Sequence, residues 1–279
     1  MTIKPQVAGR CIFCNGFKMS KEHVWSDFLT KRGLIPHQEN HTFQQIGLRD
    51  ATSSNPIIVA PPPRTKPGPL AQTKIRNVCV SCNTGWMQGM VGAVVPIVEP
   101  LVRSEAIRLD GNQQSNLANW IAISTIMAEF TDVRTAGIPK DDRVFLMNER
   151  RPPDNWTILI GRYSGTAWSP IRYRHHGLDV AASKSFDIAK SNADVSDRQQ
   201  VSTSVLGGLT IHVMSSTSKG LVSAFRNSLP TEMACIHPFV AEINWQLQPN
   251  IDDTRLLDIA DSFRDAVIHI TRNKLWYTP

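Results

Sequence analysis

The sequence predicts an α+β protein in which a small, cysteine-stapled N-terminal module, residues 1–108, precedes an α+β domain, residues 109–279. Three observations predict this organisation. Four of the five cysteines form two C-x-x-C pairs in the N-terminal part, and the whole excess of basic residues lies in the same part. After residue 109, apolar runs with strand and helix periodicity alternate, which is typical of a mixed fold.

The two cysteine pairs are Cys11–Cys14 and Cys79–Cys82, with 64 residues between them. A C-x-x-C turn places two thiolates on one side of a tight loop, or knuckle, and two knuckles supply the four sulfur ligands that zinc prefers. A redox pair, a disulfide pair and chance are the alternatives, and the repetition of the pattern favours zinc. Cys235 is isolated among apolar neighbours, so we expect it to be a small buried residue.

The N-terminus lacks the apolar stretch and cleavage site of a signal peptide, so we expect a cytoplasmic protein. In a reducing compartment, clustered cysteines are typically metal ligands or catalysts rather than disulfides. No apolar run approaches the roughly 20 residues of a membrane span, so we expect no membrane partner.

Basic residues are concentrated in residues 1–108, which hold 13 Lys and Arg against 6 Asp and Glu. The rest of the chain has a net charge of −1. A basic module favours a polyanionic partner, and nucleic acid is the commonest one, although a merely basic surface is the alternative. The cations that flank the cysteine pairs are candidates for phosphate contacts: Arg10, Lys18, Lys21, Lys74 and Arg76.

Local patterns in the N-terminal module predict a knuckle, a hairpin, and a second knuckle that opens a helix, which is a treble-clef arrangement. Asn15-Gly16 ends the first knuckle as a turn, and Ser20 is predicted to cap a short helix. Residues 41–60 contain two strand-like runs, residues 74–78 a third, and a proline-rich loop separates them. After Cys82 we expect helical segments that Pro96 and Pro100 break.

The C-terminal domain shows helical and strand patterns but no interpretable motif. We expect a buried helix at 116–130, an amphipathic helix at 255–270, and strands at 143–148, 156–161 and 209–215. The isolated histidines are expected to be non-catalytic: His175, His176 and His237.

The pair Glu22-His23 lies between the two knuckles, and Asn83 directly follows the second. A metal-dependent nuclease needs a carboxylate to hold a hard divalent cation, a neutral imidazole to accept a proton from water, and a group that orients the imidazole. Glu22, His23 and Asn83 can fill these three roles in that order.

The order C-x-x-C, Glu-His, C-x-x-C-Asn resembles the zinc-containing branch of HNH endonucleases, also called ββα-metal or His-Me finger nucleases. The segments CIFCNGFKMSKEHVWSDFL and VCVSCNTGWM are similar to a phage and bacterial group of these enzymes, and the resemblance covers roughly residues 10–100. It implies a structural zinc on the four cysteines, His23 as general base, and Glu22 as ligand of a catalytic Mg²⁺ or Mn²⁺. It also implies that Asn83 orients the base and that DNA is cut to 5′-phosphate products.

The family's third functional residue, a His or Asn about two helical turns beyond the Asn, falls at Val91 or Gly92. Neither side chain can bind a metal. The missing ligand would then come from elsewhere in the chain, and the available side chains are Glu99, His37, Glu39 and His41.

Three functions remain open from the sequence. The first is a metal-dependent HNH-type DNA endonuclease that hydrolyses phosphodiester bonds. The second is a non-catalytic, zinc-stapled nucleic-acid-binding module with a degenerate HNH site. The third is an interaction protein in which the C-terminal domain carries the function, through target choice or oligomerisation.

Overall fold

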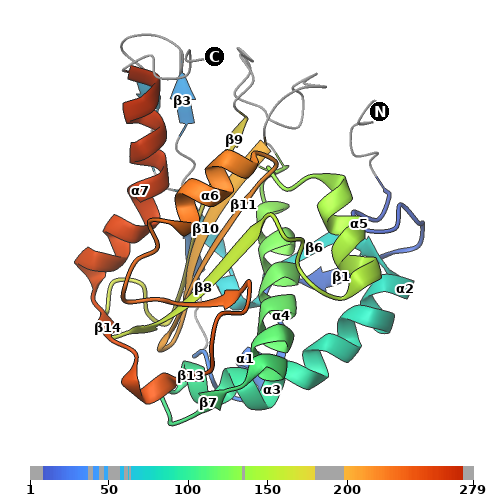
Figure 1. Cartoon of the computed structure of the whole chain (residues 1–279). Coiled ribbons are helices and arrows are strands. Elements are labelled where there is room, and N and C mark those ends of the chain that lie inside the picture. The colour runs from blue at the N-terminus through green and yellow to red at the C-terminus, as the bar shows by residue number, and fades with distance from the viewer. Residues whose placement is uncertain are drawn as a thin grey trace.

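The computed structural model describes residues 9–36, 40–43, 47–49, 57–59, 62, 64–133, 136–179 and 198–272. It is a mixed α and β structure, as predicted, with a central antiparallel sheet that has helix α4 along one face and α6 and α7 on the other (Figure 1). Of the N-terminal elements, β1, β6, α2 and α3 are drawn on the α4 side of the molecule, away from α6 and α7.

The N-terminal elements are β1 Met19–His23, α1 Phe28–Lys31, β2 Asn40–Phe43, β3 Gly47–Arg49, β4 Ile57–Val59, β5 Arg64–Pro67, β6 Lys74–Cys79, α2 Val80–Cys82, a π-helical turn Asn83–Met87, and α3 Gln88–Val102. Strand β1 pairs with β6 in an antiparallel hairpin, which the helical segment follows directly. The strand predicted at 74–78 and the helical segment after Cys82 are present, whereas β1 was not predicted, and the treble-clef arrangement stays a prediction.

The C-terminal elements are β7 Arg108–Leu109, α4 Gly111–Glu129, α5 Lys140–Glu149, β8 Trp156–Tyr163, β9 Ile171–Asp179, β10 Arg198–Leu206, β11 Leu209–Ser216, α6 Lys219–Arg226, β12 Ala234–His237, β13 Ile243–Asn244, β14 Asn250–Ile251 and α7 Asp253–Arg272. The main sheet has the order β12-β8-β11-β10-β9, and β14 pairs with β8 in parallel. The strands predicted at 156–161 and 209–215 are therefore confirmed as β8 and β11.

Helix α4 is the central element of the core, which confirms the buried helix predicted at 116–130. It begins with a capping box, in which Asp110 accepts from the Gln113 backbone and Gln113 accepts from the Asp110 backbone. Its apolar side chains are buried on several sides, because the sheet covers one side and α3 another. A helix that is apolar around most of its circumference is stable only when it is enclosed in this way.

Helix α3 runs without a break through Pro96 and Pro100, so the expected break at these prolines is wrong. A proline inside a helix costs about 3 kcal/mol through the lost hydrogen bond and ring clash. Burial of an aliphatic side chain contributes about 1.5–3 kcal/mol, and this helix buries five of them. The five are Val94, Ile97, Val98, Leu101 and Val102.

The strand expected at 143–148 is also wrong, because these residues belong to α5. A short apolar run is ambiguous between helix and strand. Two acidic residues in the first turn, Asp141 and Asp142, favour the helix through the helix dipole. The buried Arg143 then donates from Nε to the Ile12 carbonyl at 3.0 Å, which ties α5 to the first cysteine pair.

The short helix predicted after Ser20 is only partly present. Ser20 lies in β1 instead of capping a helix, and α1 is limited to Phe28–Lys31. The Ser20 hydroxyl donates to the Val78 carbonyl of β6 at 3.1 Å. Gly33 has φ +64°, a conformation that glycine adopts easily, and it lies directly after the last residue that caps this helical turn.

The two predicted parts pack closely on one another. The Trp120 indole of α4 donates to the Ser26 hydroxyl at 2.9 Å, and one continuous buried cluster includes both Phe13 and Trp120. Whether residues 1–108 and 109–279 fold as separate units stays a prediction.

One helical segment among the described residues, Val80–Val102, is long and apolar enough to cross a membrane by length and composition. It has 23 residues and a mean hydropathy of 1.3, which differs from the expectation that no such run exists. Core helices of soluble proteins satisfy the same criterion, so this is weak evidence for a membrane span.

The buried Glu129 at the end of α4 gives the stability of the fold a specific pH dependence. Burial raises the pKa of its carboxyl to about 8, although its Oε2 accepts from the Gly137 and Ile138 backbone. The folded state therefore binds a proton that the unfolded state loses near pH 4.5, and this contribution to stability is lost as pH rises towards 8. Between these pH values the free energy of unfolding should fall less steeply for Glu129→Gln than for wild type, by up to about 1.4 kcal/mol per pH unit.

Urea unfolding of both proteins between pH 5 and pH 9 measures this difference. Glutamine retains an oxygen that can accept both backbone bonds, so it tests the charge alone. Parallel pH profiles for the two proteins would show that Glu129 is ionised in the folded state.

Candidate functional site

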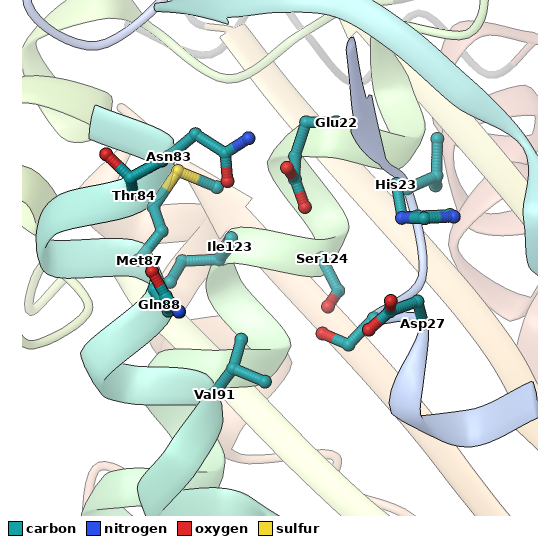
Figure 2. Close-up of a pocket in the computed structure, with 12 residues that line it drawn as sticks. Glu22, His23, Asp27, Asn83, Thr84, Met87, Gln88, Val91, Ile123 and Ser124 are labelled. Atoms are coloured by element: carbon teal, nitrogen blue, oxygen red, sulfur yellow. The ribbon is translucent and has the colours of Figure 1, made fainter. Parts of the chain in front are cut away.

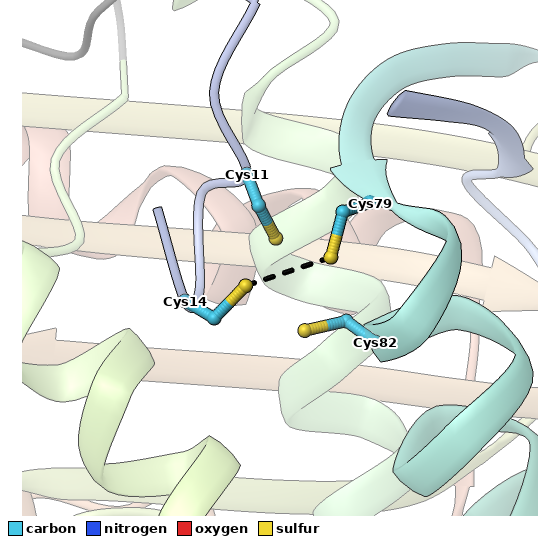
Figure 3. A group of neighbouring side chains, drawn as sticks. All are labelled: Cys11, Cys14, Cys79 and Cys82. Carbon is cyan, nitrogen blue, oxygen red and sulfur yellow. Dashed lines mark hydrogen bonds between the residues drawn. The ribbon is translucent and has the colours of Figure 1, made fainter. Parts of the chain in front are cut away.

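The four paired cysteines meet at one point, although 64 residues separate the pairs in the chain (Figure 3). All four Sγ atoms lie within 4.8 Å of one another, and Cys14 Sγ is 3.5 Å from Cys79 Sγ. Among the described residues this is the group of potential ligands compact enough to hold a metal ion.

The geometry of this group fits zinc. Zn–S bonds of about 2.3 Å in a tetrahedron place the sulfurs about 3.8 Å apart, which is close to the spacing here. A bound cation releases the protons of the four thiols and attracts all four thiolates, which accounts for their close approach. The cysteine cluster is therefore positioned to hold a metal such as zinc, as predicted.

The backbone of the first knuckle supports its sulfurs. Asn15 has φ +62°, so the chain reverses directly after Cys14. The Gly16 backbone N–H then donates to Cys14 Sγ at 3.3 Å, and a Cβ at Gly16 would lie 3.1 Å from that sulfur. In the second knuckle, Cys79 is the N-cap of α2.

A cavity of about 220 Å³ lies next to this cluster, between β1, α3 and α4. Glu22 and His23 enter it from the end of β1, and Asn83 enters it from the π-helical turn (Figure 2). The structure thus brings together the three residues that the sequence assigned to catalysis. The full lining is Glu22, His23, Val24, Ser26, Asp27, Asn83, Thr84, Met87, Gln88, Val91, Ile123 and Ser124.

Asn83 is the first residue of a π-helical turn. Gly85 departs from helical geometry at φ −93° and ψ −111°, and π-helical turns of this kind are common at functional sites. The Asn83 amide donates to Ser20 Oγ at 3.2 Å, and Ser20 donates onward to Val78. This chain of hydrogen bonds fixes Asn83 relative to the strand that carries Glu22.

The local environment shifts the pKa values of Glu22 and His23 in opposite directions. Burial raises the pKa of the Glu22 carboxyl, and a hydrogen bond from the Asn83 side chain opposes this. Burial and the nearby Lys74 cation lower the pKa of His23 below its usual value. The imidazole is therefore neutral at neutral pH, as a general base requires.

The predicted phosphate-binding cations surround the hairpin and the first knuckle. Lys74 lies directly opposite His23 in the β1–β6 register, and Arg76 projects from the same face two residues later. Lys21, Lys74 and Arg76 are exposed on the hairpin, and Lys18 is exposed beside the first knuckle. Arg10 is less available, because its guanidinium lies over the Phe17 ring at 3.4 Å.

The cavity has one acidic residue that the sequence patterns did not reveal. Asp27 lies four residues after His23, directly before α1, and its side chain lines the same cavity. An acidic residue in the mostly apolar stretch VWSDFL is the only signal that could have drawn attention to it.

The alternative ligands named from the sequence have other surroundings. Val91 lines the cavity, as the spacing predicts. Glu99 pairs with Arg32 at 2.9 Å and with Arg103 at 3.5 Å, and it is not part of the cavity lining. His37, Glu39 and the side chain of His41 lie outside the described residues.

Two histidines of the C-terminal part are less isolated than the sequence suggested. His176 Nε2 lies 3.6 Å from Asp261 Oδ1 of α7, and Arg174 pairs with the same oxygen at 2.8 Å. His175 Nδ1 lies 2.8 Å from the buried Ser202 hydroxyl. These contacts join neighbouring strands or join the sheet to α7.

Comparisons with protein-family models, with curated proteins and with solved structures found no match for this chain. The resemblance to HNH endonucleases therefore depends on the motif residues themselves.

Proposed function

We propose that this protein is a metal-dependent DNA endonuclease of HNH type, with Glu22, His23 and Asn83 in its active site. The observation that carries the proposal is the cavity that these three side chains share, next to a cysteine cluster suited to zinc. Residues 22 and 83 are far apart in the chain, so their convergence is not a consequence of local sequence.

His23 is the general base in this proposal. Its neutral imidazole accepts a proton from water, and the water oxygen bonds to phosphorus. The bond from phosphorus to the 3′ oxygen breaks, and that oxygen leaves with the electron pair and takes a proton from solvent to become a 3′-hydroxyl. The resemblance implied that Asn83 orients His23, but the contacts of its side chain are with Ser20 and Glu22. In this proposal Asn83 therefore positions Glu22, and its orientation of His23 stays a prediction.

The donor atoms in the cavity suit a hard divalent ion. They are carboxylate, amide and hydroxyl oxygens, which Mg²⁺ and Mn²⁺ prefer to sulfur. Glu22 would hold this ion, and when bound it stabilises negative charge on the scissile phosphate and the leaving oxygen. The zinc of the cysteine cluster is structural in this proposal.

A second candidate function is a zinc-stapled nucleic-acid-binding module that has lost catalysis. The observation that favours it is Val91, an apolar side chain in the cavity at the position of the family's third functional residue. Binding of DNA without cleavage distinguishes this candidate from the endonuclease.

A cleavage assay decides between the two. Zinc-loaded protein is incubated with supercoiled and linear DNA in Mg²⁺ or Mn²⁺, and the products are followed on gels. Nicking or cutting that a chelator stops at unchanged zinc content supports the endonuclease. DNA that is bound but intact under every divalent ion supports the binding module.

The DNA-binding part of the proposal predicts a specific salt dependence. Lys74→Glu with Arg76→Glu should weaken duplex binding and reduce the slope of log K against log salt by about 0.9 for each phosphate that the protein no longer neutralises. Fluorescence anisotropy at several salt concentrations measures the slope. Lys140→Glu with Lys219→Glu makes the same charge change at two exposed lysines that do not belong to the hairpin. Equal slopes for both double variants would mean that Lys74 and Arg76 do not contact phosphates.

A further inference from the structure

Asp27 has no evident structural role where it lies. It occupies the N-cap position of α1, but its side chain makes no capping hydrogen bond. Its ion pair with Lys31, at 2.6 Å, joins two side chains that are 43% and 75% exposed. An exposed pair at this spacing stabilises a helix by only about 0.3–0.5 kcal/mol.

The same side chain is well placed for the cavity. Figure 2 shows the carboxylates of Glu22 and Asp27 directed into one space, with Val91 on the opposite wall. Burial, and in smaller part the negative charge of Asp27, raises the pKa of Glu22, which agrees with their proximity.

A divalent site at this place can use a second carboxylate. Mg²⁺ and Mn²⁺ in phosphoryl-transfer sites are commonly held by one or two carboxylates together with water and substrate phosphate. Glu22 supplies one of them. The helix residue that supplies the other ligand in HNH enzymes is replaced here by Val91, whose isopropyl group has no donor atom.

We propose that Asp27 is the second protein ligand of the divalent ion and takes the place of the missing ligand at Val91. This inference rests on the proposed function, because it concerns the same ion. It assigns the ion to two carboxylates that enter from β1 and from the start of α1, with Val91 of α3 contributing no ligand.

Binding of Mn²⁺ to zinc-loaded protein tests the assignment without any cleavage assay. Electron paramagnetic resonance of free Mn²⁺ gives the dissociation constant for wild type, Glu22→Gln, Asp27→Asn and Asp154→Asn. The last variant is the control, since Asp154 is an 86% exposed carboxylate paired with Arg151 away from the cavity. Loss of a supporting group already costs 10–100-fold in metal affinity, so Asp27→Asn should weaken Mn²⁺ binding by about tenfold or more.

A Lys31→Gln variant distinguishes two roles for Asp27: a ligand of the ion, or only the partner of Lys31 in an ion pair that stabilises α1. If Asp27 binds the ion, removal of its competing cation should tighten Mn²⁺ binding, whereas Asp27→Asn weakens it. If the pair only stabilises α1, the two substitutions should shift Mn²⁺ binding in the same direction. Unfolding midpoints and zinc contents of all variants confirm that each one is folded.

The outcomes distinguish this inference from the function on which it rests. Weak Mn²⁺ binding in Glu22→Gln with normal binding in Asp27→Asn overturns the assignment of Asp27 and leaves the endonuclease intact. Weak binding in both variants, from a wild type that cleaves no DNA, supports Asp27 as a ligand and overturns the endonuclease. Normal binding in both variants overturns the assignment of Asp27 and of Glu22 together.

Discussion

His23→Ala should reduce DNA cleavage by roughly 10²–10⁴-fold, the usual contribution of a positioned general base. The imidazole lies at the end of β1 and lines the cavity, so its removal leaves the hairpin register and the cysteine cluster in place. Initial cleavage rates under saturating Mn²⁺ measure the effect. Zinc content and unfolding midpoint should match wild type.

Gln88→Ala is the matched control for this variant. Gln88 lines the same cavity from an exposed position on α3 and has no role in the proposed chemistry. A rate for His23→Ala that stays within a few-fold of the control would show that another group accepts the proton, and the roles assigned to Glu22 and His23 would then need revision.

Cys79→Ser should lose the zinc and destabilise the N-terminal part by several kcal/mol. Apparent binding energies of structural zinc are about 10–16 kcal/mol, comparable with the whole stability of a domain at about 5–15 kcal/mol. Since Arg143 of α5 donates to the Ile12 carbonyl inside the first knuckle, we expect the loosening to reach α5 as well. Metal analysis and thermal unfolding measure the two effects.

Cys235→Ser provides the control for this change. Cys235 is the fifth cysteine, partly buried in β12 and outside the cluster. It should keep one zinc per chain and lose little stability. Full zinc retention in Cys79→Ser would rule out the four-cysteine site.

The cysteine cluster was predictable because its signal is local and repeated. Each C-x-x-C spacing shapes a knuckle, and two such pairs predict a tetrahedral site whatever chain joins them. The Glu22-His23 pair and Asn83 could also be named, because their chemistry is recognisable beside the cysteines. Helix α4 was evident from its long apolar pattern, which a buried helix requires.

Other elements depended on contacts that no local pattern shows. Helix α3 continues through Pro96 and Pro100 because its buried face packs against α4, and the sequence shows only the prolines. Strands β9 and β10 were missed because polar side chains hide the strand pattern, and those of β10 are buried. Some of these polar groups pair across the two strands, as the His175 imidazole and the Ser202 hydroxyl do at 2.8 Å.

By itself the sequence determined which side chains could carry the proposed chemistry and that four cysteines could form a metal site, because both are properties of residue type and short spacing. Only the tertiary structure decided that Asp27, and not Glu99, shares a cavity with Glu22. Glu99 is held by Arg32 and Arg103, whereas the turn after β1 brings Asp27 back beside the strand it follows. This proximity depends on how strand, turn and helix pack together, and it cannot be read from the order of residues along the chain.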